Sequence, residues 1–410
     1  MRPNGVRRVK PGPRRACDAR FAGSVMLPPM LRPSVAHIAF DADQFAMLRR
    51  DLVSGALSTE RARLPAAPEQ LAAGDITALA TLDEAARERL RRRGETAIVA
   101  GEVAALVLNG GMATRFGGAV KGVVPVLPGR DELSFLAIKL AGLRTVARAV
   151  KGHVPVVLMN SFATAAATRE HLDAIAWAGM PVDERLSFEQ SLLPRVLADG
   201  TPLPELPNAQ HLEDTHVYAA PGHGDTLRRV RDSGTLARLA ARGVRHLLIS
   251  NVDNLGASLD PVVLGAHLEA VDRGAALSVE VVARAPGDAG GCVARVDGRP
   301  QIIEGFRLPA GTDLADYPHF NTNTLWVTVE ALREPYPLTW FPVHKSITGP
   351  RGEKIEVVQF EQLVGQLSEF VQTACLEVDR GRFLPIKTRE ELAEAAPKMT
   401  ELARSVGSRV

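Results

Sequence analysis

The stretch AALVLNGGMATRFGG, residues 104–118, carries a short apolar segment directly into a glycine-rich turn, and Lys121 follows three residues later. Apolar runs of this length that end in turn residues are typical of buried strands. Glycine adds no side chain and tolerates positive φ, so the backbone N–H groups of such a turn can approach phosphate groups closely. The candidate phosphate contacts are Gly110, Gly111, Thr114, Arg115 and Lys121.

This turn differs from the two best-known glycine-rich phosphate loops. No Gly-Lys-Ser or Gly-Lys-Thr follows it, as a Walker loop requires, and its glycines do not have the GxGxxG spacing of dinucleotide-binding folds. Taken alone, the stretch favours a binding loop, and a turn that only closes a strand–helix unit is the alternative. Motifs elsewhere in the chain are needed to distinguish a binding loop from a structural turn.

Two further apolar runs repeat the pattern. VPVVLMN, residues 154–160, and HLLISNVDN, residues 246–254, are separated from the first run and from each other by amphipathic stretches of helix length. Such alternation predicts a doubly wound α/β sheet. We therefore expect a Rossmann-like α/β fold with a mixed, mostly parallel central sheet, and a ligand site at the carboxyl ends of its strands.

The chain is expected to contain four regions. Residues 1–35, rich in Arg, Pro and Gly, are predicted to be a disordered basic arm, and residues 36–100 a helical lead-in. Residues 101–392 form the predicted catalytic domain, and 393–410 a C-terminal helix and tail. Within the domain, Asp297-Gly298 predicts a small inserted β-hairpin, 321–332 a strand that runs into a helix, and 357–373 an amphipathic helix.

The composition limits the kinds of partner that the chain is expected to bind. The 410 residues carry a formal net charge of +2, so no global charge recruits nucleic acid or a membrane surface, and the basic arm lacks interleaved aromatic residues that would stack bases. The three cysteines show no spacing typical of disulfide frameworks or zinc sites. No apolar run of about 18 residues occurs. We expect a soluble cytoplasmic protein that binds small molecules.

A polar cluster ends the predicted strand HLLISNVDN. Asn251, Asp253 and Asn254 follow a buried run, at the edge where open α/β sheets bind ligands. A carboxylate there suits Mg²⁺, which prefers hard oxygen ligands and shares them with substrate phosphates. Asp253 is therefore the candidate metal ligand, although the same residues could instead cap the helix that follows.

Two loops between these strands carry further candidates. Pro221-Gly222-His223-Gly224-Asp225 forms a tight loop before a helix, in which the Gly222 backbone could bond a base edge and His223 could reach a phosphate, unless it is an ordinary surface histidine. Gln190 has an amide with both a donor and an acceptor, so it is able to read a pyrimidine edge.

Seven motifs now stand in the order seen in the UDP-glucose and UDP-sugar pyrophosphorylases, the UTP:sugar-1-phosphate uridylyltransferases, and the chain resembles that family over about residues 106–392. They are LNGGMATRFGG with Lys121, VLMNSFATAAAT, FEQSLLPR, PGHGD, ISNVDNLGASLDP, FNTNTLW and RFLPIKT. A weaker match, HKSITG, contains Lys345, whose role stays open. Several linked motifs in order are far more specific than any single one.

The resemblance implies a nucleotide-diphospho-sugar transferase fold that joins UTP to a sugar 1-phosphate, glucose 1-phosphate first, with Mg²⁺ as cofactor. It assigns Arg115, Lys121 and Lys387 to catalysis and Asp253 to the metal. Leu108, Gly110, Gly111, Thr114, Gln190 and Gly222 are implied to bind the nucleotide, and His223, Asn251, Glu304, Asn321 and Asn323 the sugar phosphate.

Two departures from the family pattern and two rival functions remain. Arg115 is closer to the UDP-N-acetylhexosamine branch, so a UDP-N-acetylhexosamine or a broad range of UDP-sugars is the alternative product. Since few residues follow Lys387, we expect no C-terminal β-helix domain of the kind that many relatives carry. A nucleotide-sugar-dependent glycosyltransferase would need no glycine-rich triphosphate loop with Lys121. A non-catalytic sugar-nucleotide binder would keep the same residues without turnover.

Overall fold

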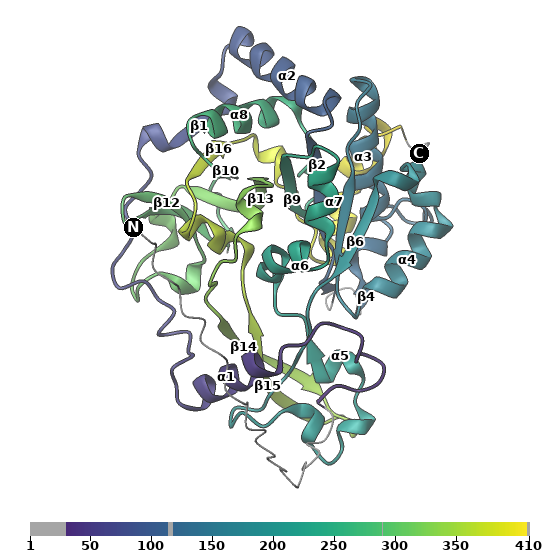
Figure 1. Cartoon of the computed structure of the whole chain (residues 1–410), viewed down its shortest axis with the longest axis vertical. Coiled ribbons are helices and arrows are strands. Elements are labelled where there is room, and N and C mark those ends of the chain that lie inside the picture. Colours follow the sequence, from purple (N-terminus) through teal and green to yellow (C-terminus); the bar gives the residue numbers. More distant parts are fainter. Residues whose placement is uncertain (1–29, 114–117, 289, 408–410) are drawn as a thin grey trace, which may run out of the picture.

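The computed structural model describes residues 30–113, 118–288 and 290–407, and its centre is a mixed sheet of ten strands (Figure 1). Eight strands follow the order β1-β16-β10-β13-β9-β2-β5-β6, and the β11–β12 hairpin attaches to β13. Pairs β2–β9, β2–β5, β5–β6, β10–β16 and β1–β16 are parallel, while β13 runs antiparallel to β9 and β10. The strands are β1 (Ile76–Ala78), β2 (Val103–Leu108), β5 (Val156–Asn160), β6 (Arg185–Glu189), β9 (His246–Asn251), β10 (Leu277–Ala283), β11 (Cys292–Val296), β12 (Arg299–Ile303), β13 (His319–Thr328) and β16 (Thr373–Glu377).

Helices cover both faces of this sheet, which explains why β2 and β5 are buried at every position. Alternate residues of β2 enter different cores: Ala105 and Val107 pack beneath α2, α3 and α8, whereas Ala104 and Leu106 pack beneath α6 and α7. The helices are α1 (Ala42–Val53), α2 (Glu84–Val99), α3 (Phe135–Ala149), α4 (Ala165–Ala174), α5 (Asp214–Val217), α6 (Thr226–Asp232), α7 (Thr235–Ala241), α8 (Pro261–Asp272), α9 (Arg389–Glu394) and α10 (Ala396–Ser405).

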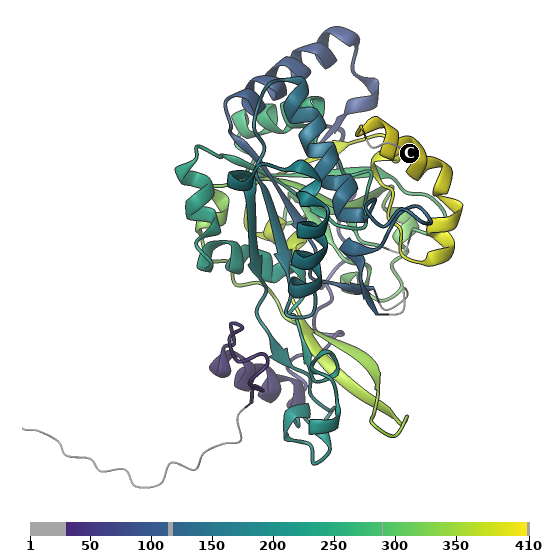
Figure 2. The ribbon, with the colours of Figure 1, turned by 90° about the vertical axis from the view of Figure 1, so that its right-hand side faces the viewer.

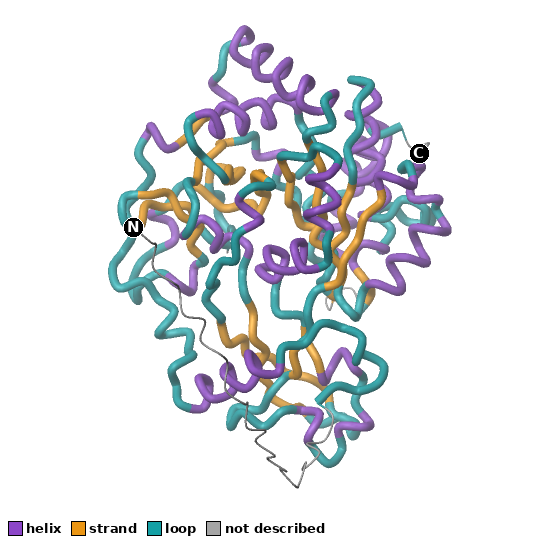
Figure 3. The backbone as a smooth tube through the Cα atoms, in the orientation of Figure 1, coloured by secondary structure: helices purple, strands orange, loops and turns teal. Residues whose placement is uncertain are grey.

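A smaller lobe lies below the sheet in Figures 1 and 2. It contains the long antiparallel hairpin of β14 (Phe341–Thr348) and β15 (Lys354–Glu361), the short pair β7 (Leu193–Pro194) and β8 (Tyr218–Ala219), and helices α1 and α5. Separate apolar clusters hold it together, one around Tyr218 and Val357 and one around Phe45 and Phe360. Figure 3 shows strands, helices and loops together in this lobe, and the residue ranges of β7, β8, β14 and β15 show that its strands come from distant parts of the chain.

The α/β fold predicted from the sequence is confirmed, including the three predicted strands β2, β5 and β9. The Asp297-Gly298 hairpin is also confirmed, with both residues at positive φ between β11 and β12. The glycine-rich turn is flanked by β3 (Met112–Ala113) and β4 (Ala119–Val120), which pair with each other. Residues 1–29 and 114–117 lie outside the described residues, so predictions that fall on them are not addressed by the structure.

Three local predictions were wrong. Residues 30–35 are not a free arm, because Arg32 bonds Tyr218 Oη through its backbone and Asp214 through its guanidinium at 2.9 Å. The region 36–100 is helical only in α1 and α2, and β1 interrupts it by pairing with β16. Residues 354–361 form β15, followed by a 3₁₀ segment over Val364–Glu369, instead of the amphipathic helix predicted for 357–373.

Strand β13 also ends differently from its prediction, since a short 3₁₀ turn over Ala331–Arg333 follows it instead of a helix. In the part of the chain that the structure describes, no helix is both long and apolar enough to cross a membrane. At the far end, α10 packs its buried Met399 and Ala403 against the same core as α3.

Helices α2 and α8 approach each other backbone to backbone at two glycines. A Cβ added to Gly94 would lie 2.0 Å from the carbonyl oxygen of Pro261, and one added to Gly265 would lie 2.1 Å from the carbonyl oxygen of Leu90. Contacts this short leave no space for any side chain, so the packing distance between the two helices is set by glycine.

We expect Gly265→Ala to lower the free energy of unfolding by about 1–3 kcal/mol, because two packed backbones would have to separate. The matched control is Gly142→Ala in α3, where the nearest atom to an added Cβ is Val406 Cγ1 at 3.7 Å. That control should gain about 0.5–1 kcal/mol from the better helix propensity of alanine. Urea unfolding of both variants checks the claim, and equal stability of the two would contradict it.

Candidate functional site

A cavity of about 1090 Å³ lies between the carboxyl ends of the central strands and the smaller lobe. Leu108 at the end of β2, Ser161 just after β5 and Asn251 at the end of β9 form its upper wall. Lys345 and Thr348 of β14 form part of the wall on the opposite side. Ligands of open α/β sheets bind at this edge, and the volume is sufficient for a nucleotide joined to a sugar.

The cavity brings together ten of the side chains and turns predicted from the sequence, although they are spread over nearly 280 residues. They are Leu108, Gly110, Gly111, Lys121, Gln190, Gly222, His223, Asn251, Asp253 and Lys387. Glu304, Asn321 and Asn323 do not line it, and Thr114 and Arg115 lie outside the described residues. The roles of all fifteen remain predictions.

The candidate metal ligand and the candidate phosphate lysine form an ion pair. Lys121 Nζ donates to Asp253 Oδ2 at 2.9 Å, and both side chains are partly accessible, at 12% and 21%. The pair joins the segment after the glycine-rich turn to the loop after β9. Each of the two charges is therefore balanced by the other, and an incoming anion would compete with Asp253 for Lys121, as an incoming cation would compete with Lys121 for Asp253.

Asp253 lies in a loop that is fixed against the segment carrying Lys387. The backbone N–H of Ile386 donates to the Asp253 carbonyl at 3.2 Å, and the buried Asn254 accepts from the Leu384 N–H through Oδ1 at 2.8 Å. These bonds bring together the two backbone segments that carry candidate residues 134 positions apart in the sequence.

A buried lysine supports the same loop from behind. Lys139 of α3 donates to Ser250 Oγ at 3.0 Å and to the Ala257 carbonyl at 3.1 Å, and so ties both ends of the loop to one helix. Burial lowers the pKa of Lys139 to about 7, while the Asp253 carboxylate opposes that shift. No motif marked this residue, because its chemistry depends on where α3 places it.

Gln190 lies between the glycine-rich turn and the PGHGD loop. Its Nε2 donates to the Gly222 carbonyl at 2.7 Å, which leaves Oε1 and a second N–H on the amide. A Cβ on Gly110 would lie only 1.9 Å from Gln190 Oε1, so glycine is required there for the amide to keep its place. Gly222 itself has φ of 75°, and an added Cβ would lie 2.5 Å from the Gln362 carbonyl oxygen.

His223 is held as a neutral ring. Its Nδ1 accepts from the Val364 backbone N–H at 3.0 Å, and burial lowers its pKa to about 4. Because Nδ1 accepts, the ring proton is on Nε2 in the neutral form. The residue therefore offers an N–H donor at the cavity wall at neutral pH, and not a positive charge.

A bulge in β13 explains how Asn323 comes near the site without lining it. The pairing with β10 shifts between Glu280 and Val281, so that Thr322 and Asn323 have no partners of their own there. Asn323 takes φ of 54° and donates through Nδ2 to Asn251 Oδ1 at 3.0 Å. Bulges commonly redirect a side chain in this way, and here the result is that Asn323 orients a cavity residue.

Asn321 and Glu304 are further from the cavity wall. Asn321 is buried and accepts from the Asn323 backbone N–H through Oδ1 at 3.0 Å, which stabilises the bulge. Glu304 follows β12; burial raises the pKa of its carboxyl, and the Arg307 guanidinium opposes that shift. Both were predicted to lie around the sugar phosphate and sugar, and neither lines the cavity.

Sequence reasoning missed a set of polar residues on the smaller lobe. Arg195 Nε donates to Gln359 Oε1 at 3.0 Å, and Gln359 in turn donates to Glu361. Burial lowers the pKa of Arg195 to about 10, opposed by the Glu361 carboxylate. All three line the cavity, as does Lys345, whose role the sequence left open. Their signal was weak because β15 was taken for a helix.

The donor set fits a metal that is shared with a ligand. Among the described residues, no group of three or more His, Cys, Asp or Glu side chains is arranged to hold a metal ion alone. Asp253 contributes one accessible carboxylate at the cavity wall. Mg²⁺ binds in this manner when substrate phosphates and water supply the other oxygens.

Comparisons with known proteins agree on one family. The sequence profile of UTP–glucose-1-phosphate uridylyltransferases matches residues 57–405. UTP–glucose-1-phosphate uridylyltransferase 2 of Dictyostelium discoideum is 30% identical over 320 residues, which cover 76% of this chain and 61% of that protein. The Saccharomyces cerevisiae enzyme is 32% identical over 304 residues, 71% of this chain and 58% of that protein. The chain thus spans about three fifths of the length of these relatives.

A solved structure gives the same answer. A variant of UDP-glucose pyrophosphorylase from Leishmania major, in complex with UDP-glucose, superposes with a TM-score of 0.67 at 26% identity. The match covers 85% of this chain and 74% of that one.

The neutral state of His223 predicts a pH dependence of stability. Its folded pKa of about 4 lies below the ordinary value of 6.5, so between these pH values the unfolded chain binds a proton that the folded protein does not. Stability therefore falls as pH falls through this window, by up to about 1.4 kcal/mol per pH unit from this residue.

The expected test is urea unfolding at pH 4.5–6.5 for the native chain and for His223→Asn, whose amide oxygen can still accept from Val364. In the variant, the free energy of unfolding should depend on pH with a slope smaller by about one proton. Part of the slope remains, because the pKa values of the buried His246 and His267 are also lowered. An unchanged slope would mean that His223 titrates normally.

Proposed function

Since the chain belongs to the UTP–glucose-1-phosphate uridylyltransferase family, we propose that it transfers a uridylyl group from UTP to glucose 1-phosphate and releases pyrophosphate. The observation that carries the proposal is the meeting of Lys121, Asp253 and Lys387 at one cavity, next to Gln190. These are the groups that a triphosphate, its metal and a second phosphate would require.

The reaction that these residues can support needs no covalent intermediate. An oxygen of glucose 1-phosphate attacks the α-phosphorus of UTP, a new P–O bond forms, and the bond to the β-phosphate oxygen breaks opposite to it. The charge stays on phosphate oxygens throughout, so the protein contributes position and compensating charge. Lys121 and Lys387 supply that charge from two different segments.

Each wall of the cavity has a distinct task in this proposal. Gln190 and the Gly222 loop hold the uracil ring, and Gly110 and Gly111 leave space for the phosphates. His223 donates from its neutral ring, and the loop of residues 251–257 bonds residues 384–386 and so places Asp253 beside the segment that carries Lys387. The smaller lobe closes the cavity with Lys345 and the Arg195 network.

Asp253 is the residue that would hold Mg²⁺. When bound, the ion would neutralise phosphate charge and orient the triphosphate. Lys121, whose Nζ lies 2.9 Å from Asp253 Oδ2, is the neighbouring cation that would contact the phosphates beside the ion.

The direct experiment measures pyrophosphate release by the full chain with Mg²⁺ and a panel of substrates. UTP with glucose 1-phosphate should be the best pair, with CTP and ATP poorer nucleotides because Gln190 matches the uracil edge. N-Acetylglucosamine 1-phosphate and galactose 1-phosphate test the sugar. Absence of turnover with every sugar 1-phosphate, with UDP-glucose binding intact, would identify a non-catalytic binder instead.

The two lysines are predicted to differ in their effects. Lys387→Met should lower kcat by a factor on the order of 10², because its charge is used where the attacking phosphate and the α-phosphoryl group meet. Lys121→Met should lower kcat and also raise the KM for UTP, because it contacts the triphosphate in the ground state as well. Steady-state kinetics distinguishes them, and near-native rates for both variants would contradict the assignment.

A further inference from the structure

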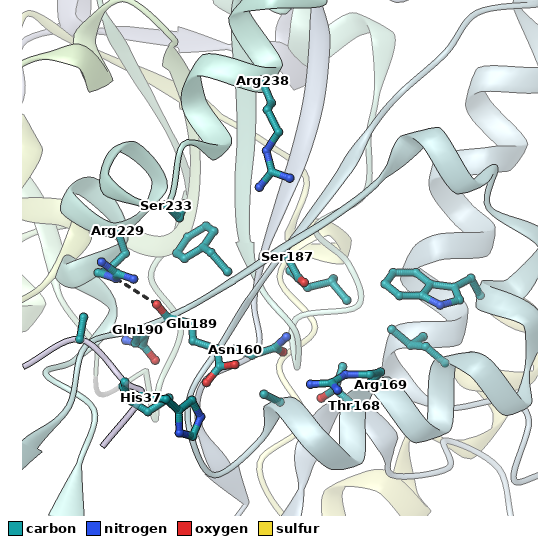
Figure 4. Close-up of a pocket in the computed structure, with 17 residues that line it drawn as sticks. His37, Asn160, Thr168, Arg169, Ser187, Glu189, Gln190, Arg229, Ser233 and Arg238 are labelled. Atoms are coloured by element: carbon teal, nitrogen blue, oxygen red, sulfur yellow. Dashed lines mark hydrogen bonds between the residues drawn. The ribbon is translucent and has the colours of Figure 1, made fainter. Parts of the chain in front are cut away.

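A second cavity, of about 270 Å³, lies beside β6, the last strand of the central sheet. Its walls come from residues 37–39 before α1, the end of strand β5, helix α4 and Trp177 after it, strand β6, and helices α6 and α7. The lining includes three arginines, one on each of three helices, namely Arg169 on α4, Arg229 on α6 and Arg238 on α7. Figure 4 shows their guanidinium groups directed toward the cavity from three sides.

The charge of this cavity is not balanced within it. Glu189 is the one carboxylate residue among its lining residues, so three guanidinium groups and one carboxylate leave a formal charge of +2. In the part of the chain that the structure describes, none of the three arginines forms an ion pair. Arg229 Nε donates to the Glu189 carbonyl at 3.1 Å, and Arg238 donates to Thr235 Oγ1 at 3.2 Å. Most of their donors are therefore available to a ligand.

These features fit an anion of a particular kind. A phosphate monoester carries a charge of about −1.5 to −2 near pH 7 and three acceptor oxygens, which matches three guanidinium groups with a surplus of +2. The Ser187 hydroxyl of β6 adds a polar group to the wall, and Trp177 and Phe188 add aromatic surface beside it. The volume suits a small molecule and not a second nucleotide sugar.

The cavity shares one lining residue with the large cavity, Gln190. Asn160 and Thr168 line the small cavity, and their Oδ1 and Oγ1 accept from Asn109 Nδ2 at 2.8 and 2.9 Å. Asn109 directly precedes the Gly110-Gly111 turn. A ligand in the small cavity would therefore contact Gln190 directly and would affect the start of the Gly110-Gly111 turn through Asn109.

We propose that this arginine-lined cavity is a second anion site, which takes a small phosphate-bearing ligand and whose occupancy is coupled to nucleotide binding through Asn160, Thr168 and Gln190. The binding itself follows from the cavity alone. The coupling rests on the proposed function, and the two parts are tested separately.

The binding test is calorimetric titration of inorganic phosphate into the full chain at constant ionic strength. The test variant is Arg169→Gln/Arg238→Gln, since both residues are exposed and hold no other element in place. The matched control is Arg148→Gln/Arg273→Gln, which removes two exposed charges elsewhere on the surface. Phosphate binding should weaken at least about tenfold in the test variant and less than twofold in the control. Equal binding by all three proteins would place phosphate in the large cavity and overturn the proposal.

The coupling test measures the KM for UTP with and without phosphate, again at constant ionic strength. Phosphate should lower it by about fivefold in the native chain, because an occupied site fixes Gln190, which lines both cavities, and Asn160, which bonds Asn109 just before the glycine-rich turn. The effect should be lost in Arg169→Gln/Arg238→Gln. A rise in KM that persists in that variant would be competition in the large cavity and would overturn the coupling. If no turnover occurs at all, the proposed function fails while the binding test stands.

Discussion

The loop after β9 is the constraint on which the candidate site depends. Its backbone bonds the segment of residues 384–386, and Lys139 fixes both of its ends from the opposite side. A second tie comes from the buried pair of Glu280 and Arg382, in which Arg382 donates at 2.8 and 2.9 Å. Removing one member of such a pair leaves a buried charge without a partner. Asp253 and Lys387 are therefore positioned by the sheet, and not by loops free to move independently.

Much of this arrangement could be predicted from the sequence. Strands β2, β5 and β9 are buried on both faces, so each is a continuous apolar run, and turn or polar residues follow at the carboxyl end. Parallel strands place those ends at one edge of the sheet, which is why the residues after β2 and β9 line a common cavity. The ordered motifs added His223, Gln190 and Lys387, whose distances along the chain gave no geometric reason to join them.

The rest depended on tertiary contacts. In residues 354–361, Val357 and Phe360 have a spacing that suits a helix, yet eight backbone pairings with β14 make the segment a strand. That error hid Gln359 and Glu361, and with them the partner of Arg195. Lys139 and the three arginines of the second cavity belong to helices whose sequences look like ordinary amphipathic surface. Their chemistry appears only when neighbouring elements define what each side chain faces.

The central claim is that the large cavity promotes a single direct displacement by position and charge alone. The rival is a double displacement in which the neutral His223 ring takes up the uridylyl group first. Both routes give the same products, but they differ in stereochemistry at the α-phosphorus. The decisive measurement uses one diastereomer of UTP with sulfur at the α-phosphate and determines the configuration of the UDP-glucose formed. Inversion is the predicted result, and retention would contradict the account.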